Sequence, residues 1–238
     1  MVVSPARLKH DPSSNASLGF ARQSGWCFSE LAGRLVQLEG GGDSAALTLT
    51  FAVILEAQQC GEPVAWITPR PAAARCSEPT VEASVFYPPD AHDTGIDLAA
   101  LPVVRVPGVT AAFAAADVLL RSGGFGLIVA DLSDVQSVAP TSLARLAGLA
   151  RRHHTALVLL TRRAAPRTHT GSRRSSMEAI SPVESQGSLG SLISLHVRSE
   201  RQRIGGDRFR CRLVVLKDKQ RGPIWTYTEW CRGAMGLR

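Results

Sequence analysis

The sequence predicts an α/β fold, in which a mostly parallel, twisted sheet is flanked by helices and ends in antiparallel strands. Between residues 35 and 161, short apolar runs of strand length alternate with longer segments of helical periodicity, as in strands joined by crossover helices. After residue 190, three strand-like runs follow one another, and Gly205-Gly206-Asp207 between the first two is a hairpin signal. Hydrophobic residues make up 45% and charged residues 20% of the 238 residues, which is ordinary for one globular core.

The first strand–turn–helix unit begins with a strand at residues 35–38 and turns at residues 40–42. Asp43 or Ser44 is expected to cap a helix that runs to Gln59. Its apolar face would carry residues 47, 51, 54 and 55. Pro- and Ala-rich residues 69–80 are expected to form a loop. Further strands are predicted at 63–68, 103–106, 126–131 and 156–161, and helices at 111–121 and 141–153.

The last three strands are predicted at residues 192–198, 208–216 and 224–230. In the middle one, Phe209, Cys211, Leu213 and Val215 alternate with arginines at 208, 210 and 212. Side chains of a strand point alternately to its two faces. The sheet should therefore end in antiparallel strands with one basic face.

The expected organisation is a flexible N-terminal arm at 1–25, a core domain at 26–230 with a long, mobile basic loop at 162–190, and a C-terminal tail at 231–238. No apolar stretch reaches the ~18 residues that span a bilayer, and no apolar run follows the basic residues of the N-terminus. The five cysteines are scattered, without metal-type spacing. We therefore expect a cytoplasmic protein that does not bind membranes.

The net charge of +7 is concentrated in two segments. Residues 151–174 contain seven arginines and no acidic residue, and residues 198–221 contain nine basic and three acidic residues. A focused positive surface favours a polyanion as partner. A solvated basic face without a partner is the alternative.

A Gly-rich turn at residues 40–44 lies where a phosphate-binding loop lies, between a strand and a helix. The candidate nucleotide-binding residues are Gly40, Gly41, Gly42, Asp43, Ser44 and Thr48. Backbone N–H groups at a helix N-terminus can hold an anion. A working loop also needs a lysine and a hydroxyl ligand for Mg²⁺, but the sequence continues Ala45-Ala46-Leu47, with Thr48 one position late. A tight turn before a helix is the alternative interpretation.

Asp131 ends an apolar strand, as a carboxylate that is presented to Mg²⁺ does. It is the one candidate catalytic residue and the one candidate Mg²⁺ ligand. Thr161 ends a later strand, where a polar nucleotide sensor would lie. Both strand ends are expected at the same edge of the sheet as the Gly-rich turn, because ligands bind at the carboxyl ends of parallel strands. Asp131 could instead cap the next turn.

An ordered series of segments resembles the RecA family. Residues 31–40 are similar to its entry to the phosphate loop, and residues 87–101 to the stretch before its fourth segment. Residues 121–131 resemble its Walker B strand, and residues 143–150 the helix that follows. The basic loop after Arg162 occupies the place of its second DNA-binding loop. Lys217 and Lys219 resemble an element that reaches the nucleotide of a neighbouring subunit. The resemblance implies a RecA-like core.

Among RecA relatives, the chain is most similar to the ImuA family. That resemblance implies a DNA-binding accessory protein of DNA-damage-induced (SOS) translesion synthesis, a form of error-prone repair. Such a protein would be cytoplasmic and nucleoid-associated. The implied partners are DNA, expected to be single-stranded, an ImuB-like polymerase-family hub protein, and RecA or a second copy of the chain. An SOS cell-division inhibitor or a RecA-modulating protein is a further alternative.

The sequence departs from the RecA pattern at the nucleotide site. Ala46 replaces the lysine, Leu47 replaces the hydroxyl ligand, and residues 67–71 contain no catalytic glutamate. ATP and Mg²⁺ are the cofactors that the resemblance implies, and no other cofactor is expected. Because these residues are missing, any ATP hydrolysis should be slow and enhanced by DNA. A weak, DNA-stimulated ATPase is the alternative function.

Contacts to the backbone of single-stranded DNA are expected from arginines in and next to the basic loop. Trp225, Trp230 and Arg232 are the candidates for docking a protein partner, because aromatic residues and arginines are enriched at binding hot spots. Packing of the tryptophans in the core is the alternative interpretation. The arginines expected to bind DNA are Arg151, Arg152, Arg162, Arg163, Arg167, Arg173 and Arg174.

Overall fold

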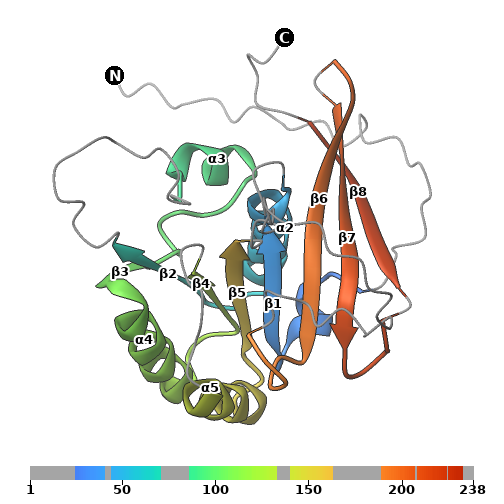
Figure 1. Cartoon of the computed structure of the whole chain (residues 1–238). Coiled ribbons are helices and arrows are strands. Elements are labelled where there is room, and N and C mark those ends of the chain that lie inside the picture. The colour runs from blue at the N-terminus through green and yellow to red at the C-terminus, as the bar shows by residue number, and fades with distance from the viewer. Residues whose placement is uncertain are drawn as a thin grey trace, which may run out of the picture.

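The computed structural model describes residues 25–40, 44–70, 86–132, 140–162, 189–206, 208–223 and 225–232. These residues form five helices and one eight-stranded sheet with the strand order β3-β2-β4-β5-β1-β6-β7-β8 (Figure 1). In chain order the elements are α1 (Phe28–Leu31), β1 (Leu35–Gly40), α2 (Ala46–Gln59), β2 (Val64–Arg70), α3 (Pro88–Asp93), β3 (Val103–Pro107), α4 (Gly108–Ser122), β4 (Leu127–Asp131), α5 (Pro140–Arg152), β5 (Ala156–Arg162), β6 (Leu195–Gly205), β7 (Arg208–Asp218) and β8 (Thr226–Arg232).

The sheet is mostly parallel, as predicted. All pairings from β3 across to β6 are parallel, and the pairings β6–β7 and β7–β8 are antiparallel. Helices lie between most of the parallel strands along the chain, because a parallel pair needs a crossover connection. The α/β fold class with an antiparallel end is therefore confirmed.

Helices cover both faces of the parallel part of the sheet. One core cluster joins α1 and α2 to side chains such as Val36, Leu38 and Val129. The second cluster joins α4 and α5 to side chains such as Leu35, Ile128 and Leu157. The strands contribute alternate residues to the two clusters, as the pleat requires. We call the two sides of the sheet the α2 face and the α5 face.

The helix α2 is more deeply buried than its sequence predicts. Leu49, Val53 and Ile54 are buried in the core, whereas Leu47 and Leu55 are only partly buried. The predicted cap is wrong in detail, because Ala45 is the N-cap residue and its side chain makes no capping hydrogen bond. Ser44 contributes from one position earlier, where its Oγ accepts a 3.4 Å hydrogen bond from the Ala46 N–H.

Several element boundaries differ from the predictions. Pro69 and Arg70 belong to β2, not to a loop, because β2 pairs with β3 as far as Arg70. The strand β8 continues to Arg232, two residues into the predicted tail. The polar residues after Arg198 were not predicted to be extended, yet β6 runs to Gly205 because it pairs with β7 along this length.

The hairpin of β6 and β7 extends beyond the end of β1, as Figure 1 shows on the right of the molecule. On its α2 face, Cys211, Leu213 and Val215 are buried in the core. The predicted alternation of β7 is therefore confirmed. The α5 face of β6, β7 and β8 is different, because none of the described helices packs extensively on it. We call this surface the open face.

Candidate functional site

The structure brings Gly40 and Ser44 together at the start of α2. A Cβ atom at Gly40 would lie 2.7 Å from the Ser44 Oγ and 3.1 Å from the Ala46 Cβ. A larger residue at the end of β1 would therefore have to displace the Ser44 hydroxyl and press against Ala46. The predicted residues Gly41, Gly42 and Asp43 lie outside the described residues.

Asp131 lies on the same side of the sheet as this turn. It is the last residue of β4 and is 3% exposed. It alternates with Leu127 and Val129, which face α2, so its carboxylate is also on the α2 face. It is level with Leu38, because both residues pair with Leu160 of β5. The predicted grouping of Gly40, Ser44 and Asp131 at one edge is consistent with this register.

Thr161 lies at the same edge but on the other face. It follows Leu157 and Leu159, which pack in the cluster below α4 and α5. Its hydroxyl accepts a 3.1 Å hydrogen bond from the Gln37 side-chain amide. The sheet therefore separates Thr161 from Asp131, and the two do not converge on one ligand at the start of α2.

Buried alanine side chains occupy the start of α2. Ala45 is 1% exposed and Ala46 is 9% exposed. Thr48 is half-buried, one turn into the helix. Within the described residues, no group of three histidine, cysteine, aspartate or glutamate side chains could hold a metal ion. The described residues at the start of α2 include no lysine to meet the phosphates, as ATP hydrolysis requires.

A buried polar cluster on the α5 face was missed in the sequence. It contains Gln37, Glu39 and Thr161 together with His196 and Arg198, and all but Arg198 are buried. The Arg198 guanidinium donates a 3.0 Å hydrogen bond to Glu39 Oε2, and His196 Nε2 lies 3.9 Å from the same oxygen. The only signal in the sequence is that polar residues alternate with apolar ones in residues 35–39.

This polar cluster fixes both ends of the predicted basic loop. Thr161 precedes the loop and contacts the Gln37 side chain. Leu189 lies near the end of the predicted loop, and its backbone N–H donates a 2.9 Å hydrogen bond to the Gln37 Oε1. Thr161 and Leu189 therefore both contact one glutamine on the α5 face.

The His196 side chain makes stability depend on pH. Burial lowers the pKa of His196, and the charges of Arg198 and Lys217 lower it further, although Glu39 opposes the shift. Below about pH 6.5 the unfolded chain binds a proton that the native protein does not bind. The free energy of unfolding should therefore fall as the pH decreases through about 6.5 towards the lower, native pKa of His196.

Urea unfolding at several pH values, with wild type and His196→Asn, measures this effect. We expect the variant to show a shallower decline over this window, and an exposed-site control, His92→Asn, to keep the wild-type slope. A His196→Asn variant with the wild-type slope would assign the pH dependence to other groups.

The described arginines that were predicted to bind DNA lie at two ends of one strand. Arg151 and Arg152 are exposed at the end of α5, before β5 begins. Arg162 is exposed at the end of β5. The length of β5 separates them by roughly 20 Å, so they do not form one compact site. Arg163, Arg167, Arg173 and Arg174 lie outside the described residues.

Lys217 and Lys219 lie near the start of β6, away from Gly40. The Lys217 ammonium donates hydrogen bonds to the carbonyls of Gly190 (3.4 Å) and Ser191 (3.0 Å). Burial lowers the pKa of Lys217, and the neighbouring charge of Lys219 lowers it further. Contacts of these lysines with a nucleotide of a neighbouring subunit stay a prediction.

The residues predicted to dock a protein partner differ in exposure. The Trp225 indole donates a 2.9 Å hydrogen bond to Asp218 Oδ2, and its ring packs against Gly25 and the core. Packing explains this tryptophan without a partner. Trp230 is 60% exposed on the open face, where it pairs with Arg210. Arg232 ends β8 opposite Arg208.

Comparisons with known proteins add no relative to these observations. No family model matches the chain, and no curated protein matches it. Among the described residues, no helix is both long and apolar enough to cross a membrane. The resemblance to RecA therefore rests on the order of the sequence segments.

Proposed function

We propose that this chain is a RecA-like, DNA-binding accessory protein, similar to the ImuA family, that supports a mutagenic polymerase in DNA-damage-induced translesion synthesis. In this proposal the core is a platform that holds DNA and docks an ImuB-like hub protein. It does not act as a motor. The α/β sheet, in which β1 leads into α2 at the carboxyl ends of the parallel strands, is compatible with a RecA-like core.

The observation that carries the proposal is the placement of positive charge. Exposed arginines lie on β7 and at the end of α5, away from the start of α2, whereas Arg162 at the end of β5 pairs with Gly40. A polyanion bound to the arginines of β7 or α5 would therefore lie outside the candidate nucleotide site. Contacts of arginine with phosphates bind DNA with little sequence preference and weaken as salt increases. Both properties suit a protein that acts at any damaged template.

The residues at the start of α2 argue against an ATP-driven motor. Ala45 and Ala46 place buried methyl groups where phosphoryl transfer needs a cation. The strand β2 carries Thr68, Pro69 and Arg70 at its end, where the RecA pattern has a glutamate that activates water. Hydrolysis would thus lack its cation and its base, and each contributes orders of magnitude in rate.

A weak, DNA-stimulated ATPase is the second candidate function. One observation favours it, because the carboxylate of Asp131 lies on the same face and edge as Gly40 and Ser44. It would require phosphates to displace the Ser44 hydroxyl from the Ala46 N–H.

The two candidates are separated by ATP turnover with and without single-stranded DNA, measured with DNA binding on the same preparation. We expect background turnover, unchanged in Asp131→Asn, and DNA binding that weakens steeply as salt rises. DNA-stimulated turnover that is lost in Asp131→Asn would establish the second candidate. A wild-type protein that binds no single-stranded DNA at low salt would contradict the proposed function. Circular dichroism should confirm that the variant is folded.

A further inference from the structure

The open face of β6, β7 and β8 is strongly basic. Among the described residues of these strands, Arg198, Arg208, Arg210 and Arg212 share this face with one acidic residue, Glu200. Arg212 pairs with Glu200 on β6, and Arg210 pairs with Gln202. Arg208 and Arg212 are exposed. Such an excess of one charge on a surface that no described helix covers attracts a polyanion.

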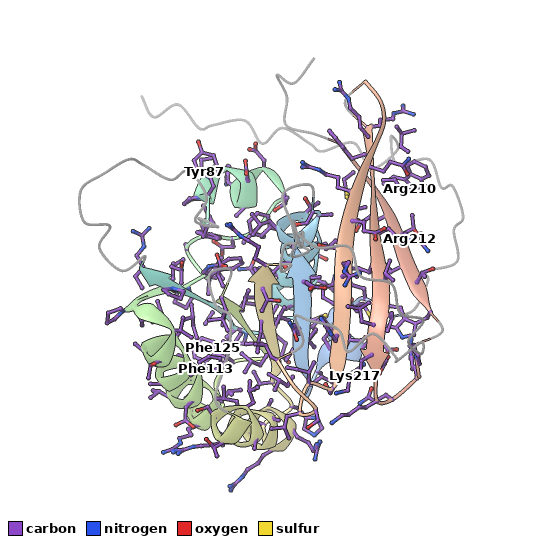
Figure 2. The ribbon with its side chains drawn as sticks, viewed as in Figure 1. Tyr87, Phe113, Phe125, Arg210, Arg212 and Lys217 are labelled. Carbon is purple, nitrogen blue, oxygen red and sulfur yellow. The ribbon has the colours of Figure 1, made fainter. Side chains whose placement is uncertain are left out.

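The arginines of β7 form an ordered row. Residues 208, 210 and 212 follow one another at a spacing of two, so their side chains project from the same face about 7 Å apart. Figure 2 shows Arg210 and Arg212 one above the other along β7. Arg210 is steadied by a hydrogen bond to the Gln202 side chain. A row of guanidinium groups along a strand can follow successive phosphates of an extended backbone.

An aromatic side chain lies within this basic row. Trp230 of β8 is directly opposite Arg210 of β7 and is 60% exposed. The other described tryptophans are different, because Trp26 and Trp66 are buried and Trp225 packs against the core. An exposed indole beside a phosphate-binding arginine provides a stacking surface for a base.

We propose that the open face binds single-stranded DNA, with Arg208, Arg210 and Arg212 contacting phosphates and Trp230 stacking on a base. The proposal rests on the proposed function and assigns it a site outside the predicted basic loop. Stacking on Trp230 requires an unpaired base, which favours a single strand over a duplex. The excess of arginine over acidic side chains favours a nucleic acid over a protein.

The open face is continuous with the ends of the predicted basic loop. Arg198 borders the open face and contacts Glu39 on β1. Gln37, two residues earlier on β1, contacts both Thr161 and Leu189. All of these contacts lie on the α5 face. The open face is therefore linked through Glu39 and Gln37 to Thr161 and Leu189.

Fluorescence anisotropy with a labelled oligothymidylate of about 20 nucleotides tests this site. We expect Arg210→Gln/Arg212→Gln to weaken binding at least about tenfold at low salt and to reduce the slope of log affinity against log salt by about 1.4. The matched control, Arg105→Gln/Arg145→Gln, removes the same charge from β3 and α5, where both side chains are exposed, and should bind like wild type.

The aromatic contact has its own variants. Trp230→Ala should weaken binding by about five- to a hundredfold without changing the salt slope, and Trp230→Phe should recover part of the loss. The control is Tyr87→Ala, because Tyr87 is 57% exposed but lies at the start of α3, away from the open face. This variant should bind like wild type. Oligothymidylate should quench the tryptophan fluorescence of wild type, and the quenching should be lost in Trp230→Ala.

The outcomes separate this site from the function on which it rests. Wild type that binds the oligonucleotide while both sets of variants bind equally well would overturn the open-face site and leave the proposed function standing. Wild type that does not bind at low salt would overturn both. Thermal unfolding of each variant should match wild type, because the substituted side chains lie outside the core.

Discussion

Replacing Asp218 with alanine is expected to lower the free energy of unfolding by about 3–5 kcal/mol. The carboxylate of Asp218 forms a 2.5 Å ion pair with the Arg34 guanidinium, and both side chains are at most 3% exposed. It also accepts hydrogen bonds from the Trp225 indole and from the backbone N–H of Gln220. Removing the carboxylate leaves the Arg34 charge buried without compensation, which costs more than the ion pair contributes.

Urea unfolding of Asp218→Ala, Arg34→Met/Asp218→Asn and Arg121→Ala measures this penalty. The double variant removes both charges and should be less destabilised than Asp218→Ala. The Arg121 side chain is 54% exposed and forms an ion pair with Asp117, which also pairs with Arg145, so Arg121→Ala should cost below about 1 kcal/mol. Equal destabilisation in the single and double variants would mean that lost packing, not an isolated charge, causes the effect.

The same carboxylate adds a pH dependence at low pH. Burial alone would raise the pKa of Asp218, but the hydrogen bonds from Gln220, Trp225 and Arg34 and the charge of Arg34 lower it below its usual value. The stability that Asp218 contributes is therefore present above the pKa of an unfolded aspartate and is lost as the pH falls through the lower, native value.

Much of the fold could be predicted because its strands carry strong local patterns. The run at residues 127–130 is apolar throughout, as in a strand that is covered on both faces. The alternation along residues 208–215 predicted which side chains of β7 are buried. By contrast, α1 and α3 have four and six residues, too few for a helical period to be visible.

The candidate site could be predicted only in part, because it depends on register. The sequence shows that Gly40 and Asp131 end strands, and the sheet places them on one face. The face of Thr161 and the cluster around Glu39 depend on pairs such as Gln37 and Thr161, which are 124 residues apart. No local pattern encodes such a pairing. Residues 199–205 were missed for a related reason, since their polar sequence becomes a strand only by pairing with β7.

Replacing Trp66 with alanine is expected to cost about 3–5 kcal/mol. The Trp66 side chain is 0% exposed, and its ring lies 5.0 Å from the Phe86 ring and 6.1 Å from the Phe51 ring, measured between centroids. Phe51 and Phe86 also meet edge to face, with ring centroids 6.1 Å apart. These three rings connect β2 and α2 to Phe86, which lies two residues before α3. Removing the Trp66 ring would therefore open a cavity between separate elements.

A second substitution at Trp66 separates the ring from its polar atom. The indole Nε1 is buried and has no hydrogen-bond partner among the described residues. Trp66→Phe removes this unsatisfied donor and keeps most of the ring, so it should cost much less than Trp66→Ala. Trp230→Ala is the control, and it should change stability by within about 0.5 kcal/mol, since that ring is exposed. Equal costs for Trp66→Ala and Trp230→Ala in urea unfolding would show that the aromatic cluster does not hold α2 on the sheet. Because α2 and β7 share one hydrophobic core, loss of the aromatic cluster should also destabilise β7 and the open face that it carries.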